Sequence, residues 1–241
     1  MRGKTVRSLV QFFKSDLGIR FIAEGAVRSS AFIITPLLSW SLGASVFGGY
    51  LQIMSLSFAF VPLVSAGLGF TVIRQLAGQR NDTKAPQLLA ISIGIISTLC
   101  VLLATVLGLL ADNTVSYFAL SMFEDSSWLV WTIPVLAWIF ATEALVGEYL
   151  RAQIKARASL YVQIASFGLH MAGLGGVLWL YELSLETALL SIAISKLVII
   201  GFVLCPVFLR LQGNDKQRST PLSLKTVLGG LPFMLAGLAE W

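Results

Sequence analysis

The sequence predicts an all-α fold, a polytopic bundle of transmembrane helices, and three observations support this. Of the 241 residues, 56% are hydrophobic and only 12% are charged, whereas a soluble globular domain carries roughly 25% charged residues. The mean hydropathy is +0.84, and apolar runs of about twenty residues are each long enough to cross roughly 30 Å of hydrocarbon. Of the connections between these runs, only every second one contains basic residues. Together these features exclude a secreted disulfide scaffold, a disordered chain and an ordinary cytosolic enzyme.

The apolar runs predict one six-helix lobe and the start of a seventh helix. Residues 1–20 place apolar side chains at helical spacing among basic ones, which favours an amphipathic helix on the cytoplasmic membrane surface; a partly ordered basic tail is the alternative. The lobe is expected over residues 21–209, with spans at 21–42, 50–70, 88–110, 128–148, 160–180 and 187–209. A cytoplasmic linker at 210–225 precedes a truncated second lobe at 226–241, which covers only about 24 Å. The sequence therefore looks incomplete at its C-terminus.

The distribution of Lys and Arg predicts the orientation of the chain. Fifteen of the seventeen basic residues lie in the N-terminal segment and in the second, fourth and sixth connections. The connections at 43–49, 111–127 and 181–186 contain none. By the positive-inside rule the N-terminus is cytoplasmic. Near the opposite ends of the spans are four aromatic residues expected to be interfacial anchors: Trp128, Trp131, Trp179 and Tyr181.

Five ionisable residues fall inside the spans. A charged side chain at the bilayer centre costs about 2.5–3.5 kcal/mol on insertion scales, so such residues are expected to face the bundle interior or a watery cavity. Glu24 and Arg28 have the favourable i,i+4 order of an intrahelical pair. Either Glu24 simply neutralises Arg28, or Arg28 projects into a cavity and binds phosphate or carboxylate.

The other three lie in later spans. Lys196 has no acidic residue within a turn of its own helix, so it must find a partner on another helix, reach the interface, lose its proton or lie in water. His170 either forms an interhelical hydrogen bond beside small residues or takes part in proton coupling. Glu143 is either a proton or cation acceptor or the counter-charge of Arg28 or Lys196. Arg28, Lys196 and His170 are thus candidates for substrate binding in a lumen, and Glu143 and Glu24 for coupling or counter-charge.

Motifs for covalent chemistry are absent from the sequence. It contains no HExxH, GxSxG, Walker or CxxC pattern. Cys100 and Cys205 both fall in apolar runs, where they are expected to be buried small hydrophobic residues. We therefore predict no enzyme activity, no cofactor and no metal site. The net charge of +5 reflects membrane topology and not nucleic-acid binding.

Four stretches carry a resemblance to a known family. LLSWSLGASVFGGY (37–50) resembles the turn after the first helix of bacterial polysaccharide flippases, and SAGLGFTVIRQLAG (65–78) the glycine-rich end of their second helix. GEYLRAQIKARASLYVQIAS (147–166) is similar to their basic turn between helices four and five, and LKTVLGGLPFMLAGLAEW (224–241) to the start of their seventh helix. The whole chain is similar to O-antigen and exopolysaccharide flippases of the multidrug/oligosaccharidyl-lipid/polysaccharide exporter superfamily.

This resemblance implies a function and a set of partners. Such flippases usually have two six-helix lobes around a central, often cationic cavity. By alternating access they move undecaprenyl-diphosphate-linked sugars across the bacterial inner membrane, for synthesis of lipopolysaccharide and other surface polysaccharides. The implied partners are lipid-linked oligosaccharide, membrane lipids, polysaccharide polymerase and chain-length proteins. The second lobe would be missing here or supplied by another chain.

Two other functions compete with this one. A multidrug cation antiporter of the same superfamily would favour acidic cavity residues, whereas the only acid of the first span is the shallow Glu24. A non-transporting membrane subunit of a polysaccharide synthesis complex would need no cavity. Finding Arg28 and Lys196 both paired and dry would support that second alternative.

Overall fold

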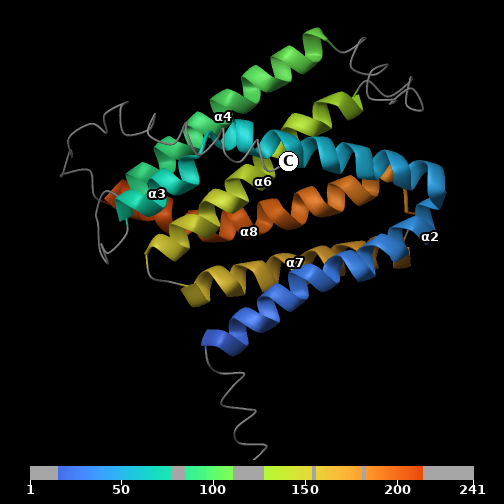
Figure 1. Cartoon of the computed structure of the whole chain (residues 1–241), viewed down its shortest axis with the longest axis horizontal. Coiled ribbons are helices and arrows are strands. Elements are labelled where there is room, and N and C mark those ends of the chain that lie inside the picture. Colours follow the sequence, from blue (N-terminus) through green and yellow to red (C-terminus); the bar gives the residue numbers. More distant parts are fainter. Residues whose placement is uncertain (1–15, 77–84, 111–127, 154–155, 181–182, 214–241) are drawn as a thin grey trace, which may run out of the picture.

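The computed structural model describes residues 16–76, 85–110, 128–153, 156–180 and 183–213, and these residues form a bundle of helices (Figure 1). The helices of these ranges are α2 (Asp16–Ser65), α3 (Leu68–Leu76), α4 (Ala85–Leu109), α6 (Trp128–Ala152), α7 (Ala156–Leu180) and α8 (Leu185–Gly213). No strand occurs among the described residues. The predicted all-α bundle is confirmed. Most of the expected N-terminal segment, most of the linker and the whole seventh span lie outside the described residues.

Helix α2 consists of two arms that fold back on each other. Its turn is at Gly43, where φ is 75° and ψ is 160°, a conformation essentially restricted to glycine. In Figure 1 the first arm of α2 runs from left to right and the second arm returns toward α3. The connection expected over residues 43–49 is therefore shorter than predicted, because the helix resumes directly after Gly43.

Among the described residues, five helices are long and apolar enough to cross a membrane. Their apolar parts are Phe32–Ser65, Ala85–Leu109, Trp131–Ala152, Arg157–Trp179 and Leu185–Val207. The first includes the turn at Gly43, so α2 accounts for the first two predicted spans. The second span, expected to run unbroken over 50–70, is interrupted at Ala66 and Gly67, whose φ values are 47° and 69°. Two successive residues in the left-handed region end a helix, and α3 starts anew at Leu68.

Helix α6 lies at the centre of the bundle. It contacts α2, α3, α4, α7 and α8. In its most apolar stretch 67% of the residues are buried, whereas the corresponding share for α7 is 17%. One buried cluster, which includes Leu38, Ile53 and Leu136, joins α2, α6 and α8. A second, which includes Val72, Leu89 and Leu145, joins α3, α4 and α6. Large apolar side chains elsewhere are exposed, as a lipid-facing surface requires: Phe32, Trp40, Val101, Trp179 and Phe202 are examples.

The described basic residues at helix ends gather at one end of the bundle. Arg74 and Arg151 lie in the last turns of α3 and α6, and Arg157 is the second residue of α7. Figure 1 shows these helix ends together on the left, whereas α8 begins on the right with Glu186 in its first turn. This separation agrees with the predicted alternation of connections that contain basic residues and connections that contain none. That the basic end faces the cytoplasm remains a prediction.

Helices α4 and α6 approach closely at Gly108, which gives a testable packing contact. A Cβ atom at Gly108 would overlap Cη2 of Trp131 and lie 2.9 Å from Cζ2 of the same ring. Gly108→Ala must displace the indole, and we expect it to destabilise the protein by about 1–3 kcal/mol. The matched control is Gly94→Ala on the same helix, where nothing lies within 4 Å of the added atom and helix propensity rises. Equal unfolding temperatures of the two variants in detergent would contradict this contact.

Candidate functional site

An ion pair joins α6 and α8 inside the bundle. The ammonium Nζ of Lys196 lies 2.7 Å from Oε1 of Glu143, although the two residues are 53 positions apart in the sequence. Of the alternatives open to Lys196, the structure thus shows a partner on another helix. Glu143 is the counter-charge of Lys196; its role as a proton or cation acceptor remains a prediction. The two side chains keep 21% and 20% of their surface exposed, so the pair is mostly but not fully buried.

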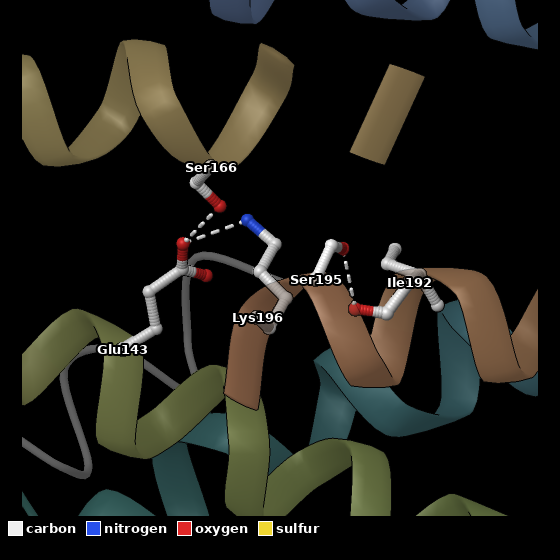
Figure 2. Close-up of polar contacts among 5 residues, drawn as sticks. All are labelled: Glu143, Ser166, Ile192, Ser195 and Lys196. Carbon is white, nitrogen blue, oxygen red and sulfur yellow. Dashed lines mark hydrogen bonds and ion pairs between the residues drawn. The ribbon is translucent and has the colours of Figure 1, made fainter. Parts of the chain in front are cut away.

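A third helix meets the same carboxylate oxygen. Ser166 on α7 donates its hydroxyl proton to Oε1 of Glu143 over 2.9 Å. Figure 2 shows both contacts converging on this one oxygen, the hydroxyl from α7 and the ammonium from α8. We call Glu143, Ser166 and Lys196 the carboxylate cluster. A lysine ammonium has three N–H donors, so the contact with Glu143 leaves Lys196 two donors for another acceptor.

The position of the carboxylate cluster in the membrane explains why the two charges are paired. Lys196 lies about 17 Å along α8 from Leu185, counting 1.5 Å per residue, which is near the middle of that span. An unpaired charge at this depth would cost about 2.5–3.5 kcal/mol or more. Pairing reduces this cost, and the added hydrogen bond from Ser166 satisfies a further lone pair of the carboxylate. The cluster therefore links α6, α7 and α8 through polar contacts.

His170 lies one helical turn after Ser166 on α7. Its side chain is 5% exposed, and neither ring nitrogen has a hydrogen-bond partner among the described residues. The backbone of Ser191 on α8 lies near the ring, and the interhelical hydrogen bond expected for His170 remains a prediction. The small residues expected near His170 do allow its helix to approach α8 closely. A Cβ atom added at Gly173 would lie 2.8 Å from Oγ of Ser191 on α8. His170 is also within electrostatic reach of Lys196, which places a third titratable group beside the carboxylate cluster.

The other two candidates, Glu24 and Arg28, are on the first arm of α2. The backbone there is helical, so the i,i+4 spacing of the two residues holds. Their side chains lie outside the described part of the chain. The pairing of Glu24 with Arg28, and a lumen position for Arg28, remain predictions.

Sequence reasoning missed the hydroxyl groups around the pair. Ser166 is a direct partner of Glu143, and Thr142 and Ser191 are buried with no hydrogen-bond partner for their hydroxyls among the described residues. Ser195, next to Lys196, bonds instead to the carbonyl of Ile192 on its own helix (Figure 2). Spacing was the available signal, because Ser166 and His170 are four residues apart, as are Ser191 and Ser195. Such spacing places each pair on one face of its helix.

The two cysteines differ in their environment. Cys100 is buried and donates its thiol proton to the carbonyl of Pro134 on α6 over 2.9 Å. Cys205 is exposed on α8, so the prediction that both are buried was wrong for this residue. Hydropathy alone does not distinguish a core position from one that faces lipid, because both are apolar.

The chain matches a known family over nearly its whole length. The model of the family described as polysaccharide biosynthesis protein matches residues 14–240. No curated protein and no solved structure matches the chain. The family match fits the bundle of apolar helices and the four stretches of sequence that resemble polysaccharide flippases. The chain therefore belongs to the polysaccharide biosynthesis protein family.

Proposed function

We propose that this protein moves lipid-linked oligosaccharide across the bacterial inner membrane during surface polysaccharide synthesis. The carrier is an undecaprenyl diphosphate, and movement occurs by alternating access. The observation that carries the proposal is the ammonium of Lys196, which lies at mid-span, keeps 21% of its side chain exposed and has two N–H donors beyond its contact with Glu143. Membership of the polysaccharide biosynthesis family supports a role in polysaccharide biosynthesis or export.

The chemistry of the carboxylate cluster suits a phosphate-bearing ligand. Phosphate oxygens accept hydrogen bonds from ammonium groups, and bonds between two charged groups are shorter and stronger than neutral ones. In the proposal Lys196 binds the diphosphate, Arg28 and His170 contribute further donors, and Glu143 balances the charge when the substrate is absent. The N-terminus and the basic end of the bundle face the cytoplasm. A second lobe, from further sequence or from another chain, completes the cavity.

Deleting the gene in its native strain tests this function. We expect surface polysaccharide to fall while its lipid-linked precursor accumulates in the membrane, because synthesis continues without export. Reintroducing the gene restores both quantities. A fall in the precursor itself would contradict transport and favour a subunit of the synthesis complex. Unchanged polysaccharide with greater sensitivity to cationic drugs would favour an antiporter.

A further inference from the structure

We infer that binding of an anion to Lys196 is accompanied by uptake of a proton at Glu143. Because Lys196 is taken as the group that binds the anion, this rests on the proposed function and concerns the fate of the carboxylate that holds the lysine. A proton from the surrounding solution joins a carboxylate oxygen of Glu143, and no other covalent bond forms or breaks. The filled site thus differs from the free one by one anion and one proton.

Any anion that binds Lys196 comes close to the carboxylate of Glu143. Nζ of Lys196 lies 2.7 Å from Oε1 of Glu143, and a hydrogen-bonded acceptor lies about 3 Å from the same nitrogen. The acceptor and Oε1 are therefore at most about 6 Å apart while the carboxylate keeps its place. Ser166 donates its hydroxyl proton to this oxygen over 2.9 Å, which favours that place.

Both ways of accommodating the anion favour a neutral Glu143. If the carboxylate stays, a second negative charge within about 6 Å disfavours its ionised form. If the anion displaces the carboxylate from Lys196, an ionised side chain without its cation remains near mid-span, where such a charge is costly. Protonation removes the repulsion in the first case and the unpaired charge in the second. Both cases hold for any anion, whether it carries one negative charge or more.

The described residues offer one alternative acceptor for the proton close to the carboxylate cluster. His170 lies one helical turn after Ser166 on α7 and is 5% exposed, but Glu143 is the group in direct contact with Lys196. Helix α4 carries no charged side chain. Other charged or titratable groups on the neighbouring helices are at the basic end of the bundle (Arg74 and Arg157), buried (Tyr50 and Cys100) or have side chains outside the described part of the chain (Asp16, Arg20, Glu24 and Arg28).

The proton has a measurable effect on binding. If the complex holds one proton more than the free protein, lowering the pH by one unit tightens binding about tenfold. This holds over the range in which Glu143 is ionised in the free protein and protonated in the complex. By reciprocity, the bound anion strengthens proton binding at Glu143 by the same factor by which the proton strengthens anion binding.

Isothermal titration calorimetry of the purified full chain in detergent tests the inference. The probe is farnesyl diphosphate esterified to a single N-acetylglucosamine, whose phosphates neither gain nor lose a proton near neutral pH. Titrations in two amine buffers of different ionisation enthalpy report the number of protons exchanged. We expect the wild type to take up about one proton for each probe bound, and to bind about tenfold more tightly for each unit by which the pH is lowered. Glu143→Gln should bind the probe without proton uptake and independently of pH.

Two control variants locate the proton. Glu148→Gln is the same substitution on the same helix, and Glu148 pairs with Arg151 at 2.8 Å outside the carboxylate cluster, so proton uptake should persist. His170→Gln should also retain it. Proton uptake that is lost in His170→Gln but kept in Glu143→Gln would place the proton on the imidazole and overturn the inference.

Infrared difference spectroscopy on the wild type keeps the test sharp if Glu143→Gln does not fold. Binding of the probe should produce the carbonyl band of a protonated carboxylic acid, and Glu148→Gln should show the same band. A spectrum without this band in a protein that binds the probe would contradict protonation of a carboxylate.

The outcomes separate the inference from the proposed function. Wild-type protein that binds the probe without taking up a proton would overturn the inference and leave the anion site at Lys196 intact. Unchanged binding in Lys196→Met would remove that site and the inference with it. The deletion strain tests translocation independently of both results.

Discussion

Lys196→Met is expected to destabilise the purified protein by about 3 kcal/mol. The substitution removes the ammonium and leaves the carboxylate of Glu143 near mid-span with Ser166 as its remaining partner among the described residues. Breaking a buried pair by removing one member is costly for this reason, and the one-fifth exposure of both side chains places the effect toward the lower end of the range. Adding Glu143→Gln to Lys196→Met removes the orphaned charge and should recover most of the stability.

A double-mutant cycle measured by unfolding in detergent tests the coupling. The comparison pair is Glu148 and Arg151, whose side chains are 25% and 52% exposed. Removing either member of this pair should cost well under about 1 kcal/mol, as is usual for exposed pairs. Additive effects of the two substitutions at Glu143 and Lys196 would show that the ion pair does not contribute to stability.

Gly43→Ala is the second substitution with a large expected effect. The φ of 75° and ψ of 160° at Gly43 belong to a backbone region that residues other than glycine rarely adopt. Alanine at this position should lower the free energy of unfolding by about 1–3 kcal/mol. The strain falls on the turn that brings the second arm of α2 back along the bundle, so correct insertion of this hairpin should suffer as well.

Gly48→Ala is the control for that turn. Gly48 lies in the second arm of the same helix, and a Cβ there would have no atom within 4 Å. Alanine at this position should be neutral or slightly stabilising, because it raises helix propensity. The two variants are compared by their yield of folded protein and their unfolding temperature. A Gly43→Ala protein as stable as Gly48→Ala would contradict the backbone conformation at the turn.

Hydropathy predicted the membrane helices well but not their ends or interruptions. The predicted span at 88–110 and the observed helix Ala85–Leu109 nearly coincide, because that segment is apolar almost from end to end. Helix α8 continues to Gly213, beyond the predicted end at 209. Hydropathy marks where the apolar stretch ends, and a helix can extend past that point into polar residues. The turn at Gly43 and the break at Ala66 and Gly67 depend on backbone angles, which an apolar composition does not report.

Sequence reasoning found the charges of the candidate site but not their arrangement. Residues Glu143 and Lys196 stood out because ionisable groups within spans are rare. Their contact depends on how α6 packs against α8, and the spacing along a single chain does not determine that packing. Ser166 escaped attention because a lone serine is common in transmembrane helices. Its role becomes visible only when its oxygen is found 2.9 Å from the carboxylate.

The leaflet position of lipid-linked oligosaccharide in the deletion strain tests the proposed translocation directly. A membrane-impermeant reagent that modifies the sugars, applied to sealed vesicles of each orientation, reports this position. We predict that the accumulated precursor lies almost entirely in the cytoplasmic leaflet, and that restoring the wild-type gene, but not Lys196→Met, returns it to the outer leaflet. Precursor equally accessible on both sides without the protein would contradict a role in translocation.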